Sequence, residues 1–100
     1  MGRFAKKVVL NSISGYSSGQ DRFLEELLND GVQLFCAVGK DCELWHDIMD
    51  EVIVGDGSED RFIRVITTWH NDEPLDEVIE FAKSYDVEGA ERLDVQVIEI

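Results

Sequence analysis

Three short apolar runs predict buried β-strands at residues 7–13, 32–38 and 62–67. Each run is rich in β-branched and aromatic residues and is bounded by Gly, Ser, Thr or Asn, as strands are. A fourth apolar run, at residues 93–100, predicts the last strand. Residues 51–54 are expected to add a short edge strand.

Between these runs, apolar residues recur at helical spacing and predict three amphipathic helices. In the first, Arg22 and Glu25 lie on the outer face, and Gly31 is in position to end the helix. Asp41 is the expected N-cap of the second helix, and Pro74 suits the first position of the third. The predicted inward residues are Phe23, Leu24, Leu27 and Leu28; Trp45, Ile48, Met49 and Val52; and Leu75, Val78, Ile79, Ala82 and Tyr85.

The alternation of strands and helices predicts a small three-layer Rossmann-like α/β domain, with three helices and a mainly parallel sheet of four or five strands. With 100 residues, 44% of them apolar, the chain is expected to form a single domain, residues 1–100, around one core. Residues 55–60 leave no room for a crossover helix, so the strand order there stays open.

The acidic composition narrows the classes of partner. Twenty-two acidic residues against nine basic ones give a net charge of −13, which repels phosphate backbones and anionic lipids. We therefore expect neither nucleic acid nor a membrane as partner. The sequence has no apolar stretch of the roughly 18 residues needed to span a bilayer. It also lacks the apolar core of a signal peptide, so we expect a cytoplasmic protein. The spacing of Cys36 and Cys42 fits neither a redox pair nor a zinc knuckle, so both are expected to be reduced.

Two segments, FCAVGKDCELWHDIMDEVIVGDG at residues 35–57 and ITTWHNDEPLDEVIEFAKSYD at residues 66–86, resemble a small bacterial family of about this length. That family is catalogued as a domain of unknown function. The resemblance covers most of the chain, and it implies no activity, cofactor or site residue.

A ligand site in such a domain is expected at the carboxyl edge of the sheet, where the loops after the strands meet. Three predicted loops reach this edge, at residues 14–21, 39–42 and 68–73. The candidate binding residues that they supply are Ser14, Tyr16, Ser17, Ser18, Lys40, Asp41, Cys42, Thr68, Trp69 and His70.

The letters GYSSG, centred on Ser17, match the GxSxG pattern of serine hydrolases, and Ser17, Asp41 and His70 follow in the order of a catalytic triad. The α/β-hydrolase sheet needs a longer chain, however, and both Ser17 and Ser18 begin capping-box patterns. Helix capping is therefore the preferred interpretation. Backbone N–H groups that bind an anion, reinforced by Lys40, are a further alternative.

Two other pairings involve Cys42. With His70 it would form a thiolate–imidazolium pair, whereas at its helical spacing it would fill the core as a small apolar residue. With His46 and Asp50 it has the spacing of metal ligands, but nothing fixes a further ligand, so neither a metal nor a cofactor is predicted. Trp69 either covers the core or lines a pocket.

The residues together favour a non-catalytic module that binds a small molecule or a protein at the carboxyl edge of the sheet. A small hydrolase or transferase that uses Cys42 or Ser17 with His70 is the first alternative. The second is a structural subunit or a homodimer that pairs through the apolar C-terminal strand.

Overall fold

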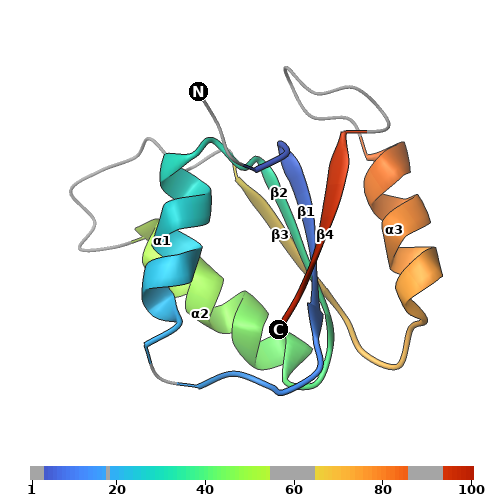
Figure 1. Ribbon diagram of the computed structural model, residues 1–100, viewed down its shortest axis with the longest axis horizontal. Coiled ribbons are helices and arrows are strands. Elements are labelled where there is room, and N and C mark those ends of the chain that lie inside the picture. The colour runs from blue at the N-terminus through green and yellow to red at the C-terminus, as the bar shows by residue number, and fades with distance from the viewer. Residues whose placement is uncertain (1–3, 18, 55–64, 86–93) are drawn as a thin grey trace.

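The computed structural model describes residues 4–17, 19–54, 65–85 and 94–100. Strands and helices alternate strictly along these residues, and Figure 1 shows the sheet between two helical layers, with α1 and α2 on one side and α3 on the other. The predicted α/β three-layer fold is thereby confirmed. The elements are β1 (Lys7–Ser12), α1 (Asp21–Asn29), β2 (Leu34–Gly39), α2 (Cys42–Val54), β3 (Ile66–His70), α3 (Leu75–Ser84) and β4 (Val95–Glu99).

The four strands form an all-parallel sheet in the order β3-β2-β1-β4. The connections through α1 and α2 carry the chain from β1 outward to β3, and α3 returns it across the other side of the sheet to β4 (Figure 1). This reversal creates a topological switch point between β1 and β4, where sheets of this kind usually bind ligands. Among the described strands, β3 and β4 form the two edges.

The two central strands supply both halves of the core, because successive strand residues point to opposite sides of the sheet. Burying each large apolar side chain stabilises the fold by about 1.5–3 kcal/mol. The half of the core between the sheet and helices α1 and α2 consists of Val8, Leu10, Leu24, Leu27, Leu28, Val32, Phe35, Ala37, Cys42, Trp45 and Met49. The half between the sheet and α3 consists of Val9, Leu34, Cys36, Val38, Val78 and Ala82.

A buried lysine joins β1 to the end of α3. The Lys7 ammonium donates to the carbonyl oxygens of Ala82 at 3.0 Å and Lys83 at 3.3 Å, in the last turn of that helix. The Ala82 carbonyl also accepts the N–H of Tyr85 at 3.2 Å, and carbonyls at the C-terminal end of a helix carry its partial negative charge. Lys7 therefore helps to fix α3 against the sheet. Within the described residues, every helix is too short or too polar to cross a bilayer.

Two predicted elements are wrong in type or position. Residues 51–54 form the last turn of α2 and not a strand, because the helical spacing of Trp45, Met49 and Val52 continues to Ile53, which packs on the core. That packing outweighs the local β-propensity of a Val-Ile-Val run.

The third strand lies at Ile66–His70, where the prediction placed it at residues 62–67. Thr68, Trp69 and His70 are therefore strand residues and not part of a loop. Their register with β2 runs from Leu34↔Ile66 to Val38↔His70. Residues 62–64 and the connection at residues 55–60 lie outside the described residues.

Candidate functional site

The switch point between β1 and β4 is bridged by the chain itself. The backbone N–H groups of Ile13 and of the candidate Ser14 donate to the carbonyl oxygen of Ile100 at 2.7 and 2.9 Å, and the N–H of Ile100 donates to Asn11 at 3.1 Å. Ligands at a switch point commonly bind to such N–H groups. Because these two already have a partner, the fold's usual ligand position is occupied by backbone.

The GYSSG loop also makes its hydrogen bonds within the chain. The N–H of Tyr16 donates to the Asp41 carboxylate at 3.1 Å, and the N–H of Ser17 donates to Oε1 of Gln20 at 2.8 Å. The N-cap of α1 is Gln20, so the prediction that Ser17 caps this helix is wrong. The bond from the Ser17 N–H to the Gln20 side chain is nevertheless one of the two bonds of a capping box. A carboxylate held against these N–H groups disfavours an anion there. Ser18 lies outside the described residues.

The loops after β1 and β2 are joined over Trp45. Its indole N–H donates to the buried Ser12 hydroxyl at 2.9 Å, and the Tyr16 ring packs edge-on against it at 5.1 Å between centroids. The backbone N–H of the candidate Lys40 donates to the carbonyl oxygen of Ser12 at 2.8 Å. These two loops therefore extend the core toward the carboxyl edge.

The predicted pair of Cys42 and His70 is not formed. Cys42 is buried among the core residues that face α1 and α2. His70 packs against Phe81 of α3, with ring centroids 4.9 Å apart, on the opposite side of the sheet. Cys42 thus has the role of a small apolar core residue, which was the other interpretation of its spacing.

His70 instead links a hydroxyl to a carboxylate. Oγ1 of Thr68 lies 2.9 Å from Nε2, and Oε2 of Glu73 lies 3.1 Å from Nδ1. Opposite an ionised carboxylate, Nδ1 carries the proton, so Nε2 of the neutral ring accepts a hydrogen bond from the Thr68 hydroxyl. Neither Ser17 nor Asp41 takes part, so the triad suggested by the letters GYSSG is not formed.

Cys36 lies beside Thr68, as its register partner on the neighbouring strand β2. Burial raises the pKa of the Cys36 thiol to about 11, and the Thr68 hydroxyl and the Lys7 ammonium offset only part of this rise. A thiol with such a pKa is a poor nucleophile near neutral pH. Both cysteines are free and buried.

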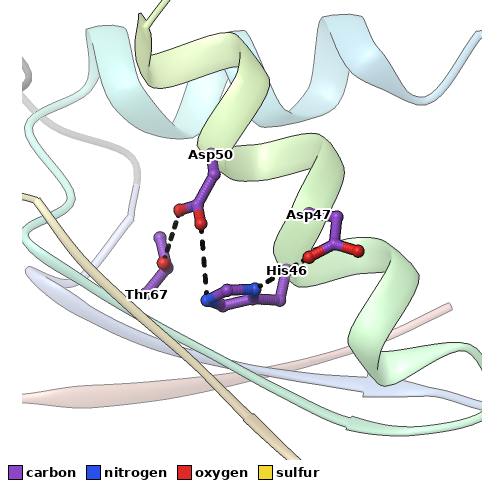
Figure 2. A network of polar contacts seen from close by, with 4 residues as sticks. All are labelled: His46, Asp47, Asp50 and Thr67. Atoms are coloured by element: carbon purple, nitrogen blue, oxygen red, sulfur yellow. Dashed lines mark hydrogen bonds and ion pairs between the residues drawn. The ribbon is translucent and has the colours of Figure 1, made fainter.

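A second polar cluster lies on the other side of β3, against α2 (Figure 2). The ring nitrogens of His46 lie 3.3 Å from Oδ1 of Asp47 and 3.5 Å from Oδ2 of Asp50. The Thr67 hydroxyl donates to Oδ1 of Asp50 at 2.6 Å. In this cluster the carboxylate lies between the hydroxyl and the imidazole. Among the described residues, no group of three potential ligands is arranged to hold a metal ion.

Trp69 covers His46. The two rings lie 4.7 Å apart between centroids at an angle of 51°, and 45% of Trp69 is exposed. Asp47 and Asp50 are also exposed, whereas His46 is largely covered. We call His46, Asp47, Asp50 and Trp69 the Trp69 surface. The sequence pointed to Trp69, but the helical spacing of His46 and Asp50 indicated only possible metal ligands with Cys42 and not partners of Trp69.

The fold and these clusters define a small α/β protein with an all-parallel sheet and a distinct polar cluster on each side of its edge strand β3. A family model described as Domain of unknown function (DUF7684) matches residues 6–100, and the chain belongs to this family. The resemblance seen in the sequence to a domain of unknown function is confirmed. Neither a curated protein nor a solved structure significantly matches the chain.

Proposed function

We propose that this protein is a binding module that recognises a basic protein segment through the Trp69 surface. The observation that carries the proposal is the exposure of Trp69, with 45% of this large aromatic residue open at the carboxyl end of a strand. Trp is usually well buried in a folded domain and is enriched at the centres of protein interfaces.

Charge selects the class of partner. The exposed carboxylates of Asp47 and Asp50 lie beside the aromatic rings, in a protein with a net charge of −13. A guanidinium on the face of Trp69 gains roughly 0.5–1 kcal/mol from its attraction to the ring, in addition to its attraction to the carboxylates. Arg suits the site better than Lys because its planar group can stack and bind a carboxylate at the same time. Nucleic acid and anionic lipid would be repelled.

The Trp69 surface is held in place before any partner binds. Thr67 fixes Asp50, and Asp50 and Asp47 fix the ring of His46 (Figure 2). That ring in turn packs against Trp69. All of these side chains come from a helix or a strand. A preorganised surface loses less conformational entropy on binding, so more of the contact energy contributes to affinity.

A calorimetric titration with a short Arg- and Ser-containing peptide tests the proposal. Trp69→Ala should weaken binding by about 10-fold or more, which corresponds to about 1.4 kcal/mol. Val54→Ala, an exposed apolar residue at the far end of α2, is the matched control and should leave the affinity unchanged. Binding should also weaken as salt is added, because the exposed charges are screened.

Equal affinity of wild-type protein and Trp69→Ala would contradict the proposal. So would equal affinity for a peptide in which every Arg is replaced by Gln. A homodimer through β4, where Val97 is partly exposed, is a weaker candidate because a net charge of −13 opposes self-association. We place the protein in the cytoplasm, since its two cysteines are free and buried and suit a reducing compartment.

A further inference from the structure

We propose that Thr68, His70 and Glu73 form an acyl-transfer site in which the Thr68 hydroxyl is the nucleophile and a small uncharged ester is the substrate. This inference does not depend on the Trp69 surface, because the three residues lie at the opposite side of β3, toward α3. It rests on the order of the groups and on the distances between them.

The order is the one that activates a hydroxyl. A nucleophile needs a base within about 2.6–3.2 Å, and the base needs a third group that orients it. Thr68 Oγ1 and His70 Nε2 are 2.9 Å apart, and His70 Nδ1 and Glu73 Oε2 are 3.1 Å apart. Because the carboxylate holds the proton on Nδ1, Nε2 is the nitrogen that can accept the proton of the hydroxyl.

The backbone fixes this arrangement. Thr68 and His70 are two residues apart on one strand and therefore point to the same side of the sheet. Asp72, just before Glu73, has φ +64, a left-handed conformation that Asp adopts more readily than most residues and that sets the direction of the chain at Glu73. The Phe81 ring packs against the imidazole at 4.9 Å and limits its rotation. The base is thus held in position before any substrate binds.

The reaction balances without a cofactor. Oγ1 of Thr68 attacks the ester carbonyl carbon while its proton moves to Nε2 of His70, and Glu73 stabilises the imidazolium that forms. The bond to the leaving alkoxide then breaks, and the alkoxide takes the proton from Nε2 as an alcohol. Water, deprotonated by His70, attacks the acyl-threonine, which releases the carboxylic acid and restores the Thr68 hydroxyl. The net charge of −13 disfavours anionic acyl donors.

The probe is p-nitrophenyl acetate, with release of p-nitrophenol followed by absorbance and the acetylated residue located by peptide mass spectrometry. We expect acetyl-Thr68 in the wild-type protein. Thr68→Val should reduce the rate by about 100-fold or more, because both the nucleophile and its proton transfer to His70 are lost. Glu73→Gln, at a half-exposed side chain, should fold normally and also slow the reaction. Thr68→Ser should retain activity.

Ser17→Ala is the matched control, because it removes the exposed hydroxyl of the GYSSG loop and should leave the rate unchanged. Thermal unfolding of each variant separates lost chemistry from lost structure. Acetylation of lysines without acetyl-Thr68 would overturn the inference, and so would wild-type rates in the folded Thr68→Val and Glu73→Gln proteins. Either result would leave peptide binding at the Trp69 surface unaffected, so the two proposals fail separately.

Discussion

Two adjacent threonines on β3 face opposite sides of the sheet and have different partners. Thr67 donates to the carboxylate of Asp50, which in turn contacts an imidazole, whereas Thr68 contacts the imidazole of His70 directly. A carboxylate is a weaker base than an imidazole and is less suited to take a hydroxyl proton near neutral pH. The order of the same three kinds of group is therefore the reason why the proposed chemistry is assigned to Thr68 and not to Thr67.

The next two residues of the strand differ in burial. Trp69 is 45% exposed, whereas His70 is 8% exposed and packs against α3. An exposed aromatic side chain has open surface that a partner can contact, whereas a buried ring already packs against other parts of the protein. We therefore expect substitutions on the α2 side of β3 to change binding, and substitutions on the α3 side to change stability and chemistry.

The largest expected effect on stability is that of His70→Ala. It removes a buried ring and leaves the half-buried Thr68 hydroxyl without its imidazole partner, which should cost about 2–4 kcal/mol in the free energy of unfolding. His46→Ala, whose partners are exposed carboxylates that water can solvate, should cost about 1 kcal/mol. Urea unfolding measures both. An equal or larger loss for His46→Ala would show that the two sides of β3 do not differ as described.

A smaller change in the free energy of unfolding is expected at alkaline pH, from the thiol of Cys36 beside Thr68. Its pKa is raised from 9.0 to about 11 in the folded protein, so the folded state holds the proton more tightly than the unfolded state. This contribution to stability is fully present below pH 9 and is lost as the pH rises toward about 11.

The loss should amount to about 2 kcal/mol by pH 11. Other groups also titrate in this range, so the measurement is the difference between wild-type protein and Cys36→Val in the pH dependence of urea unfolding. The wild-type protein should lose more stability over this interval. Parallel curves would mean that the thiol titrates alike in both states.

Most of the fold could be predicted from the sequence, because apolar periodicity is a local signal. The buried residues of α1 and α2, Leu24, Leu27 and Trp45 among them, lie where that periodicity placed them. The prediction failed where two local signals conflicted. The run from Val52 to Val54 favours a strand by composition, but the helical stripe that begins at Trp45 continues through it.

The site was harder to predict because its geometry depends on the sheet register. Placing β3 at residues 62–67 made Thr68, Trp69 and His70 a loop at one edge, and only the strand at Ile66–His70 sends them alternately to opposite sides. The partners Asp50 and Glu73 could not be identified before this alternation was known. The match to GxSxG suggested Ser17 as a partner of His70, but these letters do not specify which side chains contact His70. Its partners are Thr68 and Glu73.

Binding of a basic segment at the Trp69 surface is tested most directly by the indole N–H resonances of the protein's two tryptophans. Trp45 is an internal control, since it is fully buried and its indole N–H donates to Ser12. In a two-dimensional NMR titration with the Arg-containing peptide, the Trp69 resonance should shift progressively to saturation while that of Trp45 stays in place. A Trp69 resonance that stays constant as the peptide binds, or equal shifts of both resonances, would show that the peptide does not bind at the Trp69 surface.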